Sequence, residues 1–379
     1  MSAPRWHSSL IVYLGFAATG VGMSLPGSVL PALLTQLALN DNEAGFFFFV
    51  GWLGTSIGAL LVGRSRVAST ALASALTALG SFGLAYSTHL SCYVAMALYG
   101  VGLGMAMTAI SLHQAALFAQ ERALELNRLN LIWAAGALAG PTLGAHSLRV
   151  ASVRSIYSMI GLFFGLFALW MLVREKDAMR QEPPRTVARR SWSLRQALAM
   201  WPLPILLVIF LPTGVEASMG AWTAAYVQRS HQAIATTVTA GSCFWFGLLM
   251  SRAASVFLLR KKSAERKLLR THLLILLAGA TTLIAVTATA STLPALFLIG
   301  FGLGPIYPLL LATALTYSDA TPIFFLAGLG SAFLPWLTGI VSSQAHSLRV
   351  GLVVPLVASV AMLLLSLRIV GAGEQQARS

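Results

Sequence analysis

Two residues that are charged at neutral pH stand inside long apolar stretches of this sequence, Glu216 and Arg252. A charged side chain at the centre of a lipid bilayer costs roughly 2.5 to 3.5 kcal/mol or more, so it pairs with another group or faces a water-filled cavity. Glu216 suits proton coupling or hydrogen bonding to solute hydroxyls, and Arg252 suits hydrogen bonding as well. The structural alternative is that each side chain holds neighbouring helices together.

Other side chains in the apolar stretches suit the binding of a sugar. A sugar needs aromatic rings against its C–H faces and side chains that exchange hydrogen bonds with its hydroxyls, in a site that is otherwise apolar. The candidates are Trp52, Trp133, Trp222, Trp245, Tyr307 and Trp336 for the rings, and His113, Gln114 and Asn130 for the hydrogen bonds. The alternative for the aromatic residues is packing or a place in the belt at a membrane interface. The polar residues could instead cap helix contacts.

The elements that must position these residues are membrane-spanning helices. Hydrophobic residues make up 57% of the 379 residues and charged residues 9%, whereas soluble proteins have about 25% charged residues. Helices satisfy every backbone polar group inside lipid, and a span needs roughly 17 to 25 apolar residues. Twelve predicted spans lie at 8–35, 44–63, 67–87, 91–119, 127–145, 151–173, 202–228, 235–259, 269–288, 291–317, 321–342 and 348–370. Glu216 is the only acid deep in these predicted spans.

The second half of the sequence repeats the first. The hexapeptide AHSLRV occurs at 145–150 and again at 345–350, and the spacing GxGxG at 100–104 recurs at 300–304. An internal repeat of six spans is typical of a secondary transporter. We therefore predict a six-helix half at 1–173, a cytoplasmic linker at 174–199 and a second six-helix half at 200–379.

The net charge of +14 reflects membrane topology. Most Lys and Arg residues lie at the termini or in alternate loops, which predicts cytoplasmic termini. The short loops and the lack of a targeting segment predict a plasma (inner) membrane location. The basic loops lack the interleaved aromatics of a nucleic-acid site, so no nucleic-acid partner is expected. The sequence has no nucleotide-binding loop, nucleophile motif or metal-ligand cluster, and both cysteines lie in apolar runs. We therefore expect no enzymatic activity, cofactor, metal site or disulfide.

Five stretches carry a family resemblance: GVGMSLPGSVLPALL at 20–34, LNLIWAAGALAGPTLG at 129–144, GVEASMGAWTAAY at 214–226, GFGLGPIYPLLLA at 300–312 and GLGSAFLPWLTG at 328–339. They resemble the major facilitator superfamily, and within it the fucose/sugar permease-like branch. The sequence departs from that pattern at 63–69, where GRSRVAS lacks the aspartate of the usual gating motif. At 111–114 it has SLHQ, where the proton-coupled fucose type has an acid.

The resemblance implies an all-helical membrane protein with twelve spans in two pseudo-symmetric halves, working as a monomer by alternating access. It also implies a small-molecule substrate, most simply a sugar or related polyhydroxylated metabolite, with protons as a possible coupling ion and lipid around the helices. The alternative is a proton-coupled exporter of hydrophobic drugs or metabolites. A membrane enzyme or a non-transporting receptor is a third class, and the repeat argues against it.

Overall fold

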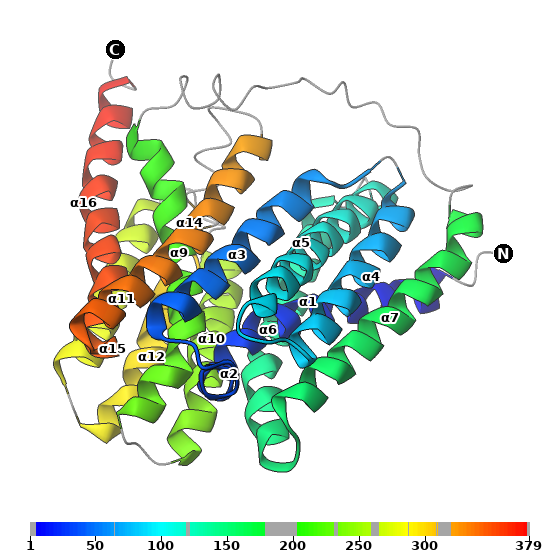
Figure 1. Ribbon diagram of the computed structural model, residues 1–379. Helices are drawn as coiled ribbons and strands as arrows, with labels where there is room; N and C mark the ends of the chain where they lie inside the picture. Colours follow the sequence, from blue (N-terminus) through cyan, green and yellow to red (C-terminus); the bar gives the residue numbers. More distant parts are fainter. Residues whose placement is uncertain are drawn as a thin grey trace. The chain divides into compact units, whose positions relative to one another are not determined.

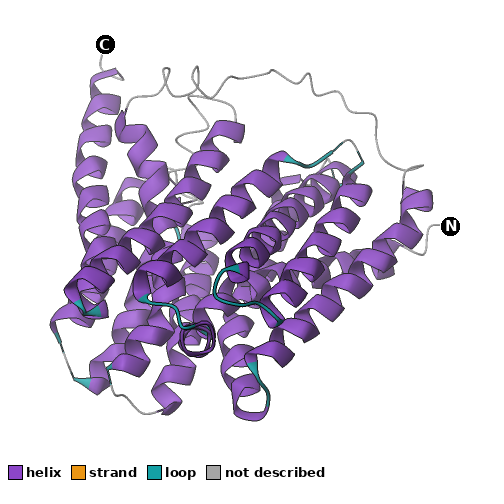
Figure 2. Cartoon of the chain, in the orientation of Figure 1, coloured by secondary structure: helices purple, strands orange, loops and turns teal. Residues whose placement is uncertain are grey.

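The computed structural model describes residues 5–63, 65–118, 122–178, 203–230, 234–258, 265–286, 288–307, 309 and 320–376. Within these ranges the regular structure is entirely helical, as Figure 2 shows. The predicted linker at 174–199 lies outside the described residues beyond Ala178. Eight of the described helices are long and apolar enough to cross a membrane.

The chain divides into two compact units, Met1–Leu39 with Val50–Val187, and Asn40–Phe49 with Ala188–Ser379. Six helices belong mainly to unit 1: α1 (Arg5–Ser28), α2 (Leu30–Leu37), α4 (Arg66–Ala85), α5 (Ser91–Leu117), α6 (Arg122–Val150) and α7 (Val153–Ala178). Seven belong to unit 2: α9 (Leu203–Arg229), α10 (Ile234–Leu258), α11 (Glu265–Ala285), α12 (Thr289–Leu303), α14 (Ala320–Ala345), α15 (Leu348–Gly351) and α16 (Val353–Gln376). The first turns of α3 (Asp41–Leu60) are grouped with unit 2 and the rest of that helix with unit 1.

Each predicted span contains a helix, but the first one is not continuous. The run at 8–35 forms α1 and α2, which are separated at Val29. Pro31 stands in the first turn of α2, where its missing N–H is tolerated. A proline also disfavours helix in the residue before it and cannot donate to the preceding turn. The predicted span at 8–35 therefore consists of two helices, and the proline accounts for the break between them.

The glycine repeat marks equivalent helix crossings in the two units. A Cβ atom on Gly100 of α5 would overlap the carbonyl of Gly51 in α3, and a Cβ atom on Gly300 of α12 would overlap the carbonyl of Phe244 in α10. Small residues at such positions allow helix backbones in a membrane to approach closely. The same packing in both units supports the internal repeat.

A second pair of crossings completes the frame of each unit. Gly136 places α6 against the carbonyl of Ala17 in α1, and Gly330 places α14 against the carbonyl of Phe210 in α9. In Figure 1 the helices α4 and α7 of unit 1 also run side by side. These close contacts hold each unit's helices as one packed body.

Candidate functional site

Glu216 and Arg252 form an ion pair inside unit 2. Glu216 lies in the middle of α9 and Arg252 lies two turns before the end of α10. The Nη2 atom of Arg252 donates to Oε2 of Glu216 at 2.9 Å. The side chains of Arg252 and Glu216 are 19% and 16% exposed. The pair therefore satisfies both charges while a part of each side chain stays accessible.

Helix α12 supplies a third wall of this site. The Nε atom of Arg252 lies 3.4 Å from the carbonyl oxygen of Gly304, the residue that caps α12. A Cβ atom on Gly304 would collide with Ser251, so a glycine is needed where α12 meets α10. Tyr307 follows Gly304 by three residues, about one helical turn, and is half-buried. We define the solute-site candidate as Glu216, Arg252 and Tyr307.

Helix α14 fixes the position of α9 beside this site. The Oγ1 atom of Thr213 donates to the carbonyl oxygen of Ala327 at 2.7 Å, and the Oγ atom of Ser331 donates to the carbonyl oxygen of Thr213 at 3.3 Å. Both bonds join α9 to α14 within one turn of Glu216. Interhelical hydrogen bonds of this kind hold helices in register inside lipid.

The structure places two predicted aromatic residues in the packing around α9. Trp222 is fully buried, and its Nε1 atom donates to the carbonyl oxygen of Pro335 at 3.0 Å. Trp245 is 6% exposed and its ring lies against α9 at Gly220, where an added Cβ atom would meet the ring at 3.2 Å. Gly220 is one turn from Glu216, so Trp245 borders the solute-site candidate. Trp222 has a structural contact that accounts for its burial.

Trp336 belongs to a different cluster of unit 2, which the sequence did not predict. The guanidinium of Arg229 donates to both carboxylate oxygens of Asp41 at 2.7 Å, and Ser342 also donates to this carboxylate. Beside them Nε1 of Trp336 donates to Oδ1 of Asn42 at 3.1 Å. The first turn of α3 is thus held to the ends of α9 and α14. Asp41 and Arg229 are oppositely charged residues at the ends of two predicted spans, and this pattern could have pointed to the ion pair from the sequence.

The other five predicted residues lie in unit 1. Gln114 on α5 is buried, and its Oε1 atom has no hydrogen-bond partner within the described part of the chain. Trp52, His113 and Trp133 are partly buried, and Asn130 is exposed. The predicted set is therefore divided between the units. Of its unit 2 members, the structure pairs Glu216 with Arg252 and places Trp245 beside them, whereas Trp336 lies in the cluster of Asp41.

Unit 1 also holds an acid that the sequence analysis missed. Glu125 on α6 is fully buried and accepts a hydrogen bond from the hydroxyl of Tyr13 on α1. Arg128 lies 3.5 Å from the same carboxylate. Glu125 lies three residues after the start of α6, outside the predicted span, so it adds a buried acid near the helix end to the one predicted deep in a span. The predicted span began at 127, whereas α6 begins at Arg122 and carries Glu125 into the helix packing.

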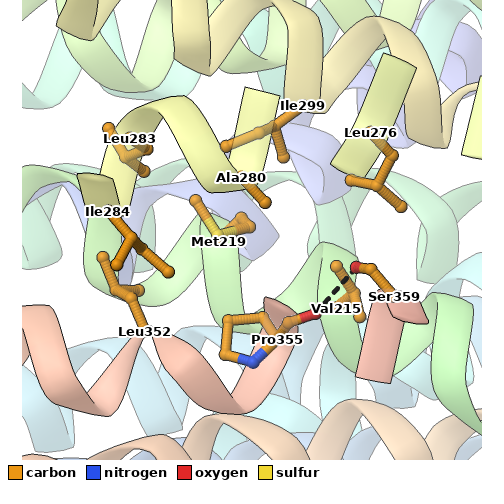
Figure 3. A pocket seen from close by; sticks show the side chains of 10 residues that line it. All are labelled: Val215, Met219, Leu276, Ala280, Leu283, Ile284, Ile299, Leu352, Pro355 and Ser359. Atoms are coloured by element: carbon orange, nitrogen blue, oxygen red, sulfur yellow. Dashed lines mark hydrogen bonds between the residues drawn. The ribbon is translucent and has the colours of Figure 1, made fainter. Parts of the chain in front are cut away.

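A small apolar hollow lies elsewhere in unit 2 (Figure 3). It is bordered by residues of α9, α11, α12 and α16, among them Val215, Met219 and Leu276. Its hydroxyl group, on Ser359, donates to the carbonyl oxygen of Pro355 at 2.7 Å. With no charged residue in its wall, this hollow offers little for the recognition of a hydroxylated solute.

The chemistry available at Glu216, Arg252 and Tyr307 is hydrogen bonding in an apolar setting. The carboxylate accepts, the guanidinium donates, and the phenol does both. Among the described residues no group of three His, Cys, Asp or Glu side chains is placed to hold a metal ion. The arrangement suits the recognition of a polar solute.

The repeated helical units and the intramembrane ion pair define a polytopic membrane protein of the transporter class. Residues 12–322 match the family model described as Major Facilitator Superfamily. The chain belongs to this superfamily, whose members are transporters. The match confirms the predicted superfamily and the predicted fold class, an all-helical membrane protein with twelve spans in two six-helix halves.

Solved structures with the same fold include a bacterial homologue of the human lysosomal transporter Spinster, in an inward-facing and occupied conformation. It is 12% identical, 97% of each chain is covered, and the TM-score is 0.74. A D-xylose-proton symporter is 13% identical, with 94% of this chain and 97% of that chain covered and a TM-score of 0.68. At these identities the likeness concerns the fold alone. No curated protein sequence matches this chain.

Proposed function

We propose that this protein transports a sugar or a related polyhydroxylated metabolite by alternating access, and that Glu216, Arg252 and Tyr307 bind the solute. The observation that carries the proposal is the ion pair of Glu216 and Arg252, joined at 2.9 Å with each side chain less than one fifth exposed. Ionisable groups at membrane depth are costly and mark solute or ion pathways.

The hydrogen-bond donors and acceptors of Glu216, Arg252 and Tyr307 favour a hydroxylated solute. A hydroxyl group donates to the free oxygen of Glu216 while its neighbour accepts from Arg252, so a vicinal diol satisfies both members without separating the charges. The phenol of Tyr307 adds a third polar contact. The ring of Trp245 lies one helical turn away on the α9 side and supplies apolar surface. A purely hydrophobic solute would leave these polar groups without new partners, at a cost in free energy.

Two further features belong to the proposal. The charge asymmetry of the loops supports a cytoplasmic place for both termini, and the short loops between the apolar stretches support a plasma (inner) membrane location. Protons are the proposed coupling ion, because Glu216 is an acid within the solute site and a similar fold is found in a D-xylose-proton symporter. The fucose/sugar permease-like branch is the proposed place of the chain within its superfamily.

Ligand-induced stabilisation of the purified protein tests the substrate class. A ligand that binds the folded state alone adds about 2.7 kcal/mol to stability at a concentration of 100 Kd. We expect a sugar or polyol to raise the melting temperature, and we expect the rise to differ between pH 5.5 and 7.5. Stabilisation by hydrophobic cations alone would instead support the exporter of hydrophobic compounds.

Two tyrosine variants make the test specific to the site. Tyr307→Phe removes the phenol one turn beyond Gly304, whose carbonyl lies 3.4 Å from Nε of Arg252, and should reduce the sugar-induced shift. Tyr157→Phe is the matched control, because the Tyr157 hydroxyl is buried in unit 1 and has no hydrogen-bond partner. Equal shifts in the two variants would refute the role of Tyr307.

A further inference from the structure

Two arginines of unit 1 lie near each other in the sequence without an acidic partner. Arg149 stands in the last turn of α6 and Arg154 in the first turn of α7, and both are exposed. Neither forms an ion pair within the part of the chain that the structure describes. The sequence has no Asp or Glu at 44–120 or at 126–174, which include α4, α5 and most of α7. The counter-charge for these arginines therefore comes from outside these helices.

Arg154 is held at the boundary of the membrane by a tyrosine. Its Cζ atom lies over the ring of Tyr86, 4.6 Å from the ring centroid. Tyr86 caps α4 directly after the candidate span Arg66–Ala85, and Arg154 is the second residue of the candidate span Val153–Val173. Tyrosine and arginine are typical of the interface between lipid and water. This pair therefore lies at the depth of the lipid headgroups.

The contact with the ring leaves the hydrogen-bond donors of Arg154 available. An aromatic ring attracts the charge of a guanidinium without using up its five N–H groups. Among the described residues no acceptor binds these N–H groups. Arg229, by contrast, donates to both carboxylate oxygens of Asp41. The side chain of Arg154 is thus positioned by Tyr86 while its N–H groups stay free for an external anion.

Exposed apolar side chains continue from this pair along both helices, which run side by side. These side chains, each between 40% and 68% exposed, are Leu79 and Phe82 on α4 and Met159 and Leu162 on α7. All four lie inside candidate membrane spans, so they face acyl chains. A molecule with an anionic head at Arg154 and an apolar tail along α4 and α7 matches this surface.

We propose that Arg154, held in place by Tyr86, binds the phosphodiester of a membrane phospholipid whose acyl chains lie along the exposed apolar residues of α4 and α7. A phosphate presents two oxygens to the fork of a guanidinium, in the bidentate geometry that arginine favours. With both termini in the cytoplasm, as proposed above, this headgroup lies in the outer leaflet. The phosphate supplies the negative charge that the helices of unit 1 lack at this end.

A free inorganic anion fits this surface less well than a phospholipid. An exposed ion pair in water contributes little to binding, and physiological salt screens it further. A free anion also makes no contact with the apolar side chains of α4 and α7. Phosphatidylglycerol fits best, because its headgroup carries a net negative charge that attracts basic residues at the membrane surface.

Arg149 lacks the support that Arg154 has. Within the described residues no aromatic ring lies against its guanidinium. Fixing the side chain of Arg149 on a phosphate therefore costs conformational entropy that Arg154 has already lost on Tyr86. We expect Arg154 to contribute more to lipid binding than Arg149, although the two residues carry the same charge.

Native mass spectrometry of the full chain in detergent, titrated with phosphatidylglycerol, tests the proposal. Wild type should bind the lipid saturably, and Arg154→Gln should weaken this binding by about fivefold, the effect of one basic residue beside an anionic lipid surface. Arg149→Gln is the matched control, because it removes an exposed arginine at the same turn between α6 and α7 and should change the affinity little. Tyr86→Leu leaves the charge in place but removes the ring, so it should weaken binding by less than Arg154→Gln.

Two further ligands separate the phosphate from the acyl chains. Diacylglycerol with the same chains lacks the phosphate, so it should bind more weakly than phosphatidylglycerol and equally to wild type and Arg154→Gln. Inorganic phosphate lacks the chains, and millimolar concentrations of it should not displace bound phosphatidylglycerol.

Each outcome supports or overturns the site. A loss of phosphatidylglycerol binding in Arg154→Gln, with little change in Arg149→Gln, supports it. Unchanged affinity in Arg154→Gln overturns it, an equal loss in Arg149→Gln overturns it in favour of a general attraction by exposed charge, and displacement by inorganic phosphate overturns it in favour of a free-anion site. If Arg154→Gln does not fold, Tyr86→Leu decides, and unchanged affinity in that variant overturns the proposal.

Discussion

A double-mutant cycle on Glu216 and Arg252 measures how strongly the two charges depend on each other. At the observed 2.9 Å, two unit charges attract by about 6 kcal/mol at an effective dielectric constant of about 20, and by about 1.4 kcal/mol in water. Loss of hydration on both side chains offsets much of this attraction. Because each side chain keeps a small exposed fraction, we expect a coupling energy of about 1 to 3 kcal/mol.

The stability losses of the two single variants should therefore add up to more than the loss in the double variant. Glu216→Gln or Arg252→Gln leaves one charge without its partner, at a cost of about 2 to 4 kcal/mol, somewhat below the value for fully buried pairs. The combination Glu216→Gln with Arg252→Gln leaves neither charge, so its loss should be clearly less than the sum. Thermal unfolding in one detergent, followed by tryptophan fluorescence, gives the four melting temperatures of the cycle.

Arg128→Gln is the matched control for Arg252→Gln. Arg128 is 51% exposed and lies 3.5 Å from the carboxylate of Glu125, which keeps the hydrogen bond from Tyr13, so its removal should cost less than Arg252→Gln. Strictly additive losses across the cycle at Glu216 and Arg252 would refute the reasoning, because they would mean that the two side chains do not interact.

Three other substitutions have expected outcomes. Gly300→Ala should lower the melting temperature, because overpacking at this crossing costs about 1 to 3 kcal/mol of stability. Gly165→Ala is the control and should change the melting temperature little, because a Cβ atom at Gly165 would have its nearest neighbour 3.9 Å away. Equal shifts in the two variants would contradict the tight crossing. Tyr13→Phe should cost about 1 to 3 kcal/mol, since the buried carboxylate of Glu125 loses a donor, and an unchanged melting temperature would argue against that bond. Asp41→Asn should make the first turn of α3 exchange its amide hydrogens faster, and unaltered exchange would show that the charge is unimportant there.

Much of the fold could be predicted because few backbone structures can span a lipid bilayer. Apolar length and the requirement to satisfy backbone groups define spanning helices, and the repeated GxGxG spacing predicted two related halves. The break at Val29 was harder to predict, because apolar content continues through Pro31 and a proline inside a spanning helix is often tolerated. Hydropathy alone does not register such a break.

The candidate site was predictable to the extent that charge in lipid is rare. That reasoning selected Glu216 and Arg252, and the structure joins them. It missed Glu125, because the acid lies near the end of a predicted span, where sequence cannot distinguish a buried side chain from one in water. It also left Trp222 among the ring candidates, since composition does not reveal that its indole N–H binds the carbonyl of Pro335. Side-chain partners depend on helix rotation and contact, which periodicity alone does not determine.

Uptake of a radiolabelled sugar into proteoliposomes, measured for wild type and Glu216→Gln at equal amounts of folded protein, tests the central claim most directly. The sugar used is the one that stabilises the purified protein. We expect saturable uptake by wild type, and for Glu216→Gln a loss of at least tenfold in uptake per amount of folded protein. Equal uptake by the two proteins would contradict the assignment of Glu216 to the solute site.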